Sequence, residues 1–310
     1  MLGAIIGDIA GSIYEFDKSL YNKDKVPQPL YNSSCFLTDD SVMTLAIADA
    51  CMTWRNLGFS INSKADTNAI KALSYCAEKS MHIFGNMYPN MGYGGMFKQW
   101  LKQETPKPYG SKGNGALMRV SPVGWVAETE FEAIEMAKAV TSVTHNTDEA
   151  INGATAVALA ILHGRFNTIE SRIISLTYDF VDVVDEIYPK VNERLEYSKF
   201  ELFNYYRDNG YEGWLCNDTL PQAALCLLLG MRTYNPLNWA ISIGGDSDTL
   251  GAIVGSISQA FGNLYMTNKE MICFAFKLSE YPKLCEIDTK FCSRFNVRKI
   301  GIKKNPAVWK

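Results

Sequence analysis

Helical spacing of apolar residues is the feature that most constrains how this chain can fold. Apolar side chains recur three or four positions apart in five stretches, at residues 41–57, 129–140, 147–163, 218–229 and 248–261. Two of these stretches carry helix-start signals, since Thr129 precedes Glu132 in a capping-box pattern and Pro221 lies near a first turn. Clear apolar–polar alternation, typical of half-buried strands, is missing from the sequence, and the run 181–184 is ambiguous. The pattern predicts an all-α protein and disfavours a parallel α/β fold.

The segments between these stretches indicate loops rather than interdomain linkers. Residues 17–35 are polar and contain two prolines, residues 88–95 are rich in glycine, and residues 105–115 combine prolines with glycines. None is long or repetitive enough to separate two folding units. At 310 residues the chain can bury a large core, so we expect a single domain over residues 1–310.

Bulk composition excludes several classes of protein. The net charge of −3 gives no general attraction to nucleic acid or to anionic membranes. The basic segment 290–310 is interpreted as a solvated terminus, with a nucleic-acid or partner contact as the alternative. The eight cysteines lack metal-site spacing and favour reduced thiols in a cytoplasmic protein. Neither a signal peptide nor an apolar run long enough to cross a membrane is expected.

Two short acidic motifs carry most of the chemical information. Residues 38–41 read Thr-Asp-Asp-Ser, and residues 244–249 read Gly-Gly-Asp-Ser-Asp-Thr. Each joins two carboxylates to hydroxyl groups at the start of a helix-like stretch, and such oxygen donors suit Mg²⁺ or Mn²⁺. If folding brings the motifs together, four buried carboxylates need counter-charge from cations. The alternative for each motif alone is a helix cap, but their joint occurrence favours a metal site.

Further candidates flank these motifs. Asp8 lies in an apolar, glycine-rich run and is either part of the site or a buried cap for a neighbouring helix. Glu15 precedes a polar loop and suits a substrate contact or a base, with an ordinary surface glutamate as the alternative.

A glycine-rich turn and a histidine form the third group of candidates. Residues 113–115 (Gly-Asn-Gly) enter a helix-like stretch, where backbone N–H groups bind phosphate well, although most such turns are only turns. His145 precedes another helix and is either a diphosphate contact or structural. Arg119 is either near this site or in a structural ion pair, and Tyr109 either stacks on a purine or packs in the core.

The motifs occur along the chain in the order seen in the ADP-ribosylglycohydrolase family, and the chain resembles that family from residue 3 to about residue 262. In chain order the motifs are residues 7–15, 37–41, 113–115, 144–145 and 244–249. That family includes the dinitrogenase reductase-activating glycohydrolases and the ADP-ribosyl-acceptor hydrolases. The resemblance implies an all-α, single-domain orthogonal helical bundle with a binuclear site for two Mg²⁺ or Mn²⁺ ions. Ser247 stands where the family often has threonine, and that position need not be a ligand.

The resemblance also implies roles for individual residues. Six become metal ligands: Thr38, Asp39, Asp40, Asp246, Asp248 and Thr249. Glu15 corresponds to the glutamate beside the scissile bond. The residues expected near the ADP-ribose diphosphate are Gly113, Asn114, Gly115 and His145. Four carboxylates remain open as the group that orients water or takes its proton: Glu15, Asp39, Asp246 and Asp248.

The expected function is metal-dependent hydrolysis of ADP-ribose from an acceptor at C1 of the distal ribose, through an oxocarbenium-like transition state. The acceptor stays open: arginine, serine, a nucleobase, O-acetyl-ADP-ribose or another small ADP-ribosyl compound. One alternative is a non-catalytic ADP-ribose-binding protein of the same fold. The other is a haloacid-dehalogenase-type phosphatase, because residues 246–250 (Asp-Ser-Asp-Thr-Leu) resemble its D-x-D-x-T motif; that motif should follow a hydrophobic strand.

Overall fold

The computed structural model describes residues 2–16, 32–166, 199–208, 213–230, 236–262, 264–266, 268–297 and 299–302. Within these ranges the chain is almost entirely helical, so the predicted all-α class is confirmed. The described strands are the two-residue segments β1 (Tyr265–Met266) and β2 (Gly301–Ile302), which pair in parallel. The ambiguous run 181–184 and most of the polar loop 17–35 lie outside the described residues.

Each of the five predicted helical stretches coincides with a helix of the structure, namely α2, α7, α8, α13 and α15, and the structure describes further helices besides these. The bounds of the helices are α1 Leu2–Gly11, α2 Asp39–Asn56, α3 Thr67–Met87, α4 Gly95–Leu101, α5 Gly115–Met118, α6 Ser121–Val126, α7 Glu130–Thr141, α8 Asp148–Phe166, α12 Lys199–Asp208, α13 Cys216–Gly230, α14 Pro236–Ile243, α15 Ser247–Phe261, α16 Asn268–Ser279 and α17 Pro282–Arg294. Thr129 caps α7 as predicted, since its hydroxyl accepts the Glu132 N–H at 3.1 Å. Pro221 lies inside α13 rather than in its first turn, because that helix begins earlier, at Cys216.

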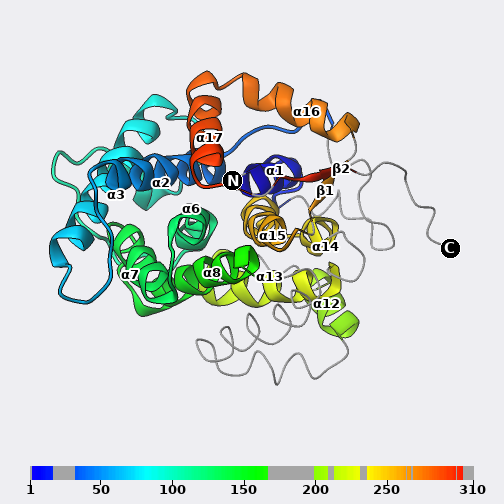
Figure 1. The fold of residues 1–310 in the computed structure, drawn as a ribbon. Helices are drawn as coiled ribbons and strands as arrows, with labels where there is room; N and C mark the ends of the chain where they lie inside the picture. Colours follow the sequence, from blue (N-terminus) through cyan, green and yellow to red (C-terminus); the bar gives the residue numbers. More distant parts are fainter. Residues whose placement is uncertain are drawn as a thin grey trace.

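Helix α15 lies at the centre of the fold, between α1 on one side and α8 and α13 on the other (Figure 1). All of its residues are buried. Three glycines of α1, at positions 3, 7 and 11, face the backbone of α15 at Gly255, Gly251 and Ser247. Without side chains the two helices approach at backbone contact. This contact brings the start of α15, with the second acidic motif, beside the C-terminal end of α1.

We expect Gly7→Ala to destabilise the protein. A Cβ atom at Gly7 would lie 1.9 Å from the Gly251 carbonyl oxygen, so the helices must separate. Alanine has a helix propensity about 1 kcal/mol more favourable than glycine. Overpacking at a rigid backbone contact costs about 3 kcal/mol or more, so the net effect on the free energy of unfolding is a loss. Urea unfolding measures the difference. Gly94→Ala is the control, because a Cβ there meets no atom within 4 Å; equal stability of the two variants would contradict this packing.

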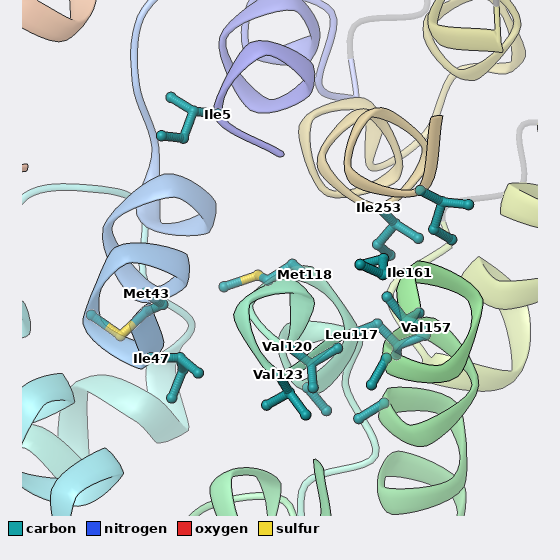
Figure 2. Close-up of a cluster of buried hydrophobic side chains, with 14 of the residues drawn as sticks. Ile5, Met43, Ile47, Leu117, Met118, Val120, Val123, Val157, Ile161 and Ile253 are labelled. Atoms are coloured by element: carbon teal, nitrogen blue, oxygen red, sulfur yellow. The ribbon is translucent and has the colours of Figure 1, made fainter. Parts of the chain in front are cut away.

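Apolar side chains from six segments meet in the core beside the site. Figure 2 shows Ile5 from α1, Met43 and Ile47 from α2, Leu117 and Met118 from α5, Val120 and Val123 at α6, Val157 and Ile161 from α8, and Ile253 from α15. These residues are all buried. Because the short helix α5 is held in this core, the Gly-Asn-Gly turn that precedes it has a fixed place relative to α2 and α15.

The basic C-terminal segment is only partly a solvated terminus. Lys290 is exposed and pairs with Glu286 on the surface of α17. Phe291 is fully buried, however, and Arg294 donates to the Met52 carbonyl of α2 at 3.4 Å. The described part of this segment therefore belongs to the folded body, while residues 303–310 lie outside the described residues.

All eight cysteines are free thiols, as the sequence predicted, and five of them are buried. Among the residues that the structure describes, no helix has both the length and the apolar character that crossing a membrane would require.

Candidate active site

Both acidic motifs open onto one cavity of about 550 Å³, a volume that suits a small-molecule ligand. Of the site residues predicted from sequence, the cavity is lined by Glu15, Asp39, Asp40, Gly113, Asn114, Gly115, His145, Asp246, Asp248 and Thr249. Thr38 is not among the lining residues, and its hydroxyl bonds to Asp8 and to the Asp40 amide. The fold thus brings together groups that are more than 200 positions apart in the sequence.

The first motif is held by a buried carboxylate from α1. Thr38 is the N-cap of α2, and its hydroxyl accepts the Asp40 N–H at 3.3 Å. Asp8 accepts the Thr38 hydroxyl at 2.7 Å, and the amides of Thr38 and Ser41 at 3.1 Å each. The Ser41 hydroxyl also donates to Asp8. Asp8 is therefore the buried cap of a neighbouring helix, which was the alternative considered for it, and it fixes the direction in which Asp39 and Asp40 leave α2.

The second motif is shaped by two glycines. Gly244 and Gly245 have φ values of 84° and 74°, a region that side chains disfavour. The turn they form places Asp246 at the N-cap of α15. The Gly245 carbonyl accepts the Phe16 N–H at 3.0 Å, which ties the end of the α1 segment to this turn. Glu15 is thereby held next to the motif, and single oxygens of Glu15, Asp246 and Asp248 lie within 4.8 Å of one another.

Direct contacts join the two motifs. The Thr249 hydroxyl donates to Asp40 Oδ2 at 3.2 Å. The other oxygen of that carboxylate, Asp40 Oδ1, is buried and has no hydrogen-bond partner. Asn114 donates from Nδ2 to Asp246 Oδ2 at 2.7 Å, so the Gly-Asn-Gly turn supports the second motif. A buried carboxylate oxygen without a donor is costly and needs a further partner.

Burial and mutual repulsion oppose ionisation of the whole cluster. Burial first, and then the Asp248 charge, raise the pKa of Asp8 and that of Glu15 to about 7 each. The same two causes hold the pKa of Asp39, of Asp40 and of Asp246 well above the usual aspartate value. Among the described residues, no Lys or Arg nitrogen pairs with these carboxylates within 4.0 Å. If the carboxylates are ionised together, they need counter-charge that no Lys or Arg side chain of the described residues supplies by direct pairing.

These observations fit a divalent cation. The donors are carboxylate and hydroxyl oxygens, which Mg²⁺ and Mn²⁺ prefer, and within the described part of the chain no cysteine or histidine joins the acidic group. Asp40 Oδ1 offers a free lone pair in the buried part of the cluster. The geometry differs from the sequence expectation in one respect. Glu15, expected to contact substrate, lies as close to Asp246 and Asp248 as a ligand would.

The Gly-Asn-Gly turn is less open than its sequence suggested. The Gly113 amide donates to Ser111 Oγ at 3.1 Å, and the Asn114 amide donates to the Trp214 carbonyl at 2.9 Å. Asn114 Nδ2 also donates to the Gly213 carbonyl at 2.9 Å. Two of the three backbone donors expected to face phosphate are thus engaged inside the protein. The turn instead anchors the segment before α13 and positions Asp246.

Arg119 and His145 lie in the cavity wall behind this turn. The alternative of a structural ion pair for Arg119 is wrong, because no carboxylate among the described residues lies within 4.0 Å of its guanidinium. Arg119 contacts His145 Nδ1 at 3.3 Å instead. Tyr109 is half-buried, and its ring packs against the imidazole with centroids 5.8 Å apart.

Sequence reasoning missed several residues that line the cavity. Gly92, Gly94 and Gly95 border it, with Gly92 facing Asp39, and their segment was interpreted only as a loop. Phe16 and Trp214 also line it, with their rings edge to face and 5.6 Å apart. Both rings are exposed, and Phe16 has a φ of 53°, which is rare for a residue with a side chain. The glycine-rich run was a signal for the first group, but nothing in the sequence singled out Trp214.

Comparison with protein families decides the classification. The family model described as ADP-ribosylglycohydrolase matches residues 1–262. The chain belongs to the ADP-ribosylglycohydrolase family. It is similar to the ADP-ribosylhydrolase ARH3 of Mus musculus, with 23% identity over 323 residues, covering 84% of this chain and 82% of the relative. The human ARH3 is 22% identical over 321 residues, and the alignment covers 84% of each chain.

The fold of this family member also matches a solved structure. The chain titled "ADP-ribosylglycohydrolase-related protein complex" superposes with a TM-score of 0.58 at 18% identity, over 96% of both chains. The structure does not support the phosphatase alternative. The segment before Asp246 is the helix α14 rather than a strand, so the resemblance to the D-x-D-x-T motif lacks its structural context, and Leu250 stands where that motif has threonine.

Proposed function

We propose that this ADP-ribosylglycohydrolase family member is a metal-dependent hydrolase. It cleaves the glycosidic bond between C1 of the distal ribose of ADP-ribose and an acceptor. The observation that carries the proposal is the convergence of the two acidic motifs, with Glu15, on one cavity beside His145 and Arg119. The buried oxygen cluster that suits cations matches the ribose hydroxyls of such a substrate. The cavity wall with the buried guanidinium matches its diphosphate.

The cation ligands would come from both motifs. We assign them to Asp39 and Asp40 with Thr38 at the start of α2, and to Asp246 and Asp248 with Thr249 at the start of α15. Two Mg²⁺ or Mn²⁺ ions bound there would supply counter-charge and Lewis-acid chemistry. Asp8 and Asn114 hold these ligands in place through the hydrogen bonds described above.

Glu15 is the best-placed group to move a proton. Among the described residues its carboxylate accepts no hydrogen bond, although it lines the cavity beside Asp246 and Asp248. A water that adds to C1 can pass its proton to Glu15, while the bond from C1 to the acceptor breaks and the acceptor leaves with the bonding electrons. Glu15 can then return the proton to the departing group.

The proposed reaction defines which molecules the protein binds. We propose an ADP-ribosylated protein, nucleic acid or small molecule as substrate and ADP-ribose as product, with no membrane partner. The eight free thiols support a reducing compartment, and we therefore place the protein in the cytoplasm.

A panel of ADP-ribosylated substrates tests the proposal. Arginine-, serine- and nucleobase-linked ADP-ribose and O-acetyl-ADP-ribose are each offered with Mg²⁺ and with Mn²⁺. We expect ADP-ribose release from at least one linkage, loss of release in chelator, and recovery when metal returns. Tight binding of ADP-ribose without release from any linkage would favour a non-catalytic member of the fold.

We expect His145→Ala to weaken ADP-ribose binding much more than ribose binding. The imidazole lies behind the Gly-Asn-Gly turn, in the part of the cavity assigned to the diphosphate, which ribose lacks. Isothermal calorimetry with both ligands measures the difference. His163→Ala is the control, because this histidine pairs with Glu130 away from the cavity. Unchanged ADP-ribose affinity would remove His145 from the site.

A further inference from the structure

Arg119 is a buried cation with an unusual set of partners. Its side chain is almost completely buried, and among the described residues no carboxylate pairs with it. Its Nη2 atom donates to Thr144 Oγ1 at 2.5 Å and lies 3.3 Å from His145 Nδ1. A guanidinium carries only donors. His145 Nδ1 must therefore accept, and it must be the unprotonated nitrogen of the ring.

Thr144 leads to the same assignment by an independent contact. Its hydroxyl oxygen accepts from Arg119, so its own proton is free to donate. The two acceptors within reach are His145 Nδ1 at 2.7 Å and the Thr141 carbonyl at 3.4 Å, and the first is the shorter contact. Two donors thus converge on one ring nitrogen, which leaves the proton of a neutral imidazole on Nε2.

The charge state of His145 agrees with this tautomer. An imidazolium would be buried and would face the Arg119 guanidinium across a 3.3 Å contact. Burial first, and then the Arg119 charge, hold the pKa of His145 well below its usual value. Among the described residues the ring also contacts Tyr109, Thr144 and the Gly-Asn-Gly turn, and none of these carries a carboxylate.

The free donor faces the ligand cavity. Nε2 lies 3.4 Å from the Cβ position of Gly115 and 3.9 Å from that of Gly113, so the absence of side chains there leaves its N–H uncovered. Among the described residues Nε2 has no hydrogen-bond partner, although His145 is only 5% exposed. An N–H that opens onto the cavity from a buried ring and has no acceptor in the described protein points to an acceptor supplied by a ligand.

We propose that Arg119 and Thr144 are positioning residues that fix His145 as the neutral Nε2–H tautomer, so that it donates to an anionic oxygen of the bound ligand. The inference rests on the proposed function, under which that oxygen belongs to the diphosphate of ADP-ribose. Arg119 has a second effect in the same place, since its unpaired buried charge makes this wall of the cavity attractive to an anion.

Nitrogen-15 NMR of the imidazoles and ADP-ribose binding test the inference together. The chain has three histidines, at positions 82, 145 and 163, so the spectrum is simple to assign. In the wild type at pH 7 we expect His145 as the neutral Nε2–H form. Thr144→Val keeps the shape and removes one donor to Nδ1. We expect it to mix the tautomers and weaken ADP-ribose binding about 3–10-fold, raising KM while leaving kcat nearly unchanged.

Thr144→Ser is the matched control, because it keeps the hydroxyl, and we expect wild-type tautomer and affinity. Arg119→Met is the second variant; it removes the donors to Nδ1 and keeps an unbranched side chain, and we expect a tautomer change with a folded circular-dichroism spectrum. An Nδ1–H or cationic His145 in the wild type would overturn the inference, as would Thr144→Val with unchanged tautomer and affinity. If wild-type His145 is the Nε2–H form but the protein fails to bind ADP-ribose, the proposed function is contradicted. The part of this inference that assigns the anionic oxygen to ADP-ribose is then contradicted as well.

Discussion

Asp248→Asn is expected to lower kcat by at least ~100-fold, because losing one carboxylate charge from a cation site removes stabilisation of the transition state. Asp248 lies in the first turn of α15, is buried, and lines the cavity with Glu15 and Asp246. Asparagine keeps the size of the side chain. The fold should persist, since the apolar core surrounding α15 is untouched. The measurement is steady-state hydrolysis of the best substrate from the linkage panel, with protein stripped of metal and refilled.

Asp148→Asn is the matched control for this variant. Asp148 is an exposed carboxylate in the first turn of α8 and does not line the cavity. Its replacement removes the same charge from a similar helix position, and we expect wild-type turnover. Near-wild-type turnover of the refilled Asp248→Asn protein would remove Asp248 from the proposed cation site.

Glu15→Gln is expected to reduce turnover by ~10²–10⁴-fold, the range typical of losing a general base. Glutamine keeps the length of the side chain but cannot take a proton from water. We expect metal affinity to change far less than turnover, because the assigned ligands Asp40, Asp246 and Asp248 stay in place. Metal titration and single-turnover kinetics on the same variant separate the two effects.

Glu104→Gln, at an exposed position outside the cavity, is the control for Glu15→Gln and should match the wild type in both measurements. The proximity of Glu15 to Asp246 and Asp248 makes the metal titration decisive. A large loss of metal affinity would make Glu15 a ligand. An unchanged single-turnover rate would return it to an ordinary glutamate at the edge of a loop.

Sequence patterns located five helices well, α2, α7, α8, α13 and α15, because local interactions set where these helices begin and end. Apolar spacing fixes which residues face the core, and capping residues such as Thr129 fix where a helix starts. Pro221 shows the limit of such signals. It was expected near a first turn, but Cys216 and the residues after it extend α13 further toward the N-terminus.

The site was harder to predict, because its geometry depends on tertiary packing. The number of residues between Asp40 and Thr249 does not reveal how far apart they lie in space. Their 3.2 Å contact follows from the backbone contact of α1 with α15. The engagement of the Asn114 amide by Trp214 is equally invisible in sequence, because its partner comes from a segment about 100 residues later. Asp8 was interpretable in advance, since an aspartate in an apolar run must find donors.

Anomalous diffraction from a crystal containing Mn²⁺ and ADP-ribose tests the central claim most directly. We expect Mn²⁺ peaks between the two acidic motifs, in contact with Asp40 and Asp248. We also expect the distal ribose beside them and the diphosphate within hydrogen-bond reach of His145 Nε2. ADP-ribose bound away from this cavity, or a fully loaded crystal without Mn²⁺ between the motifs, would contradict the account.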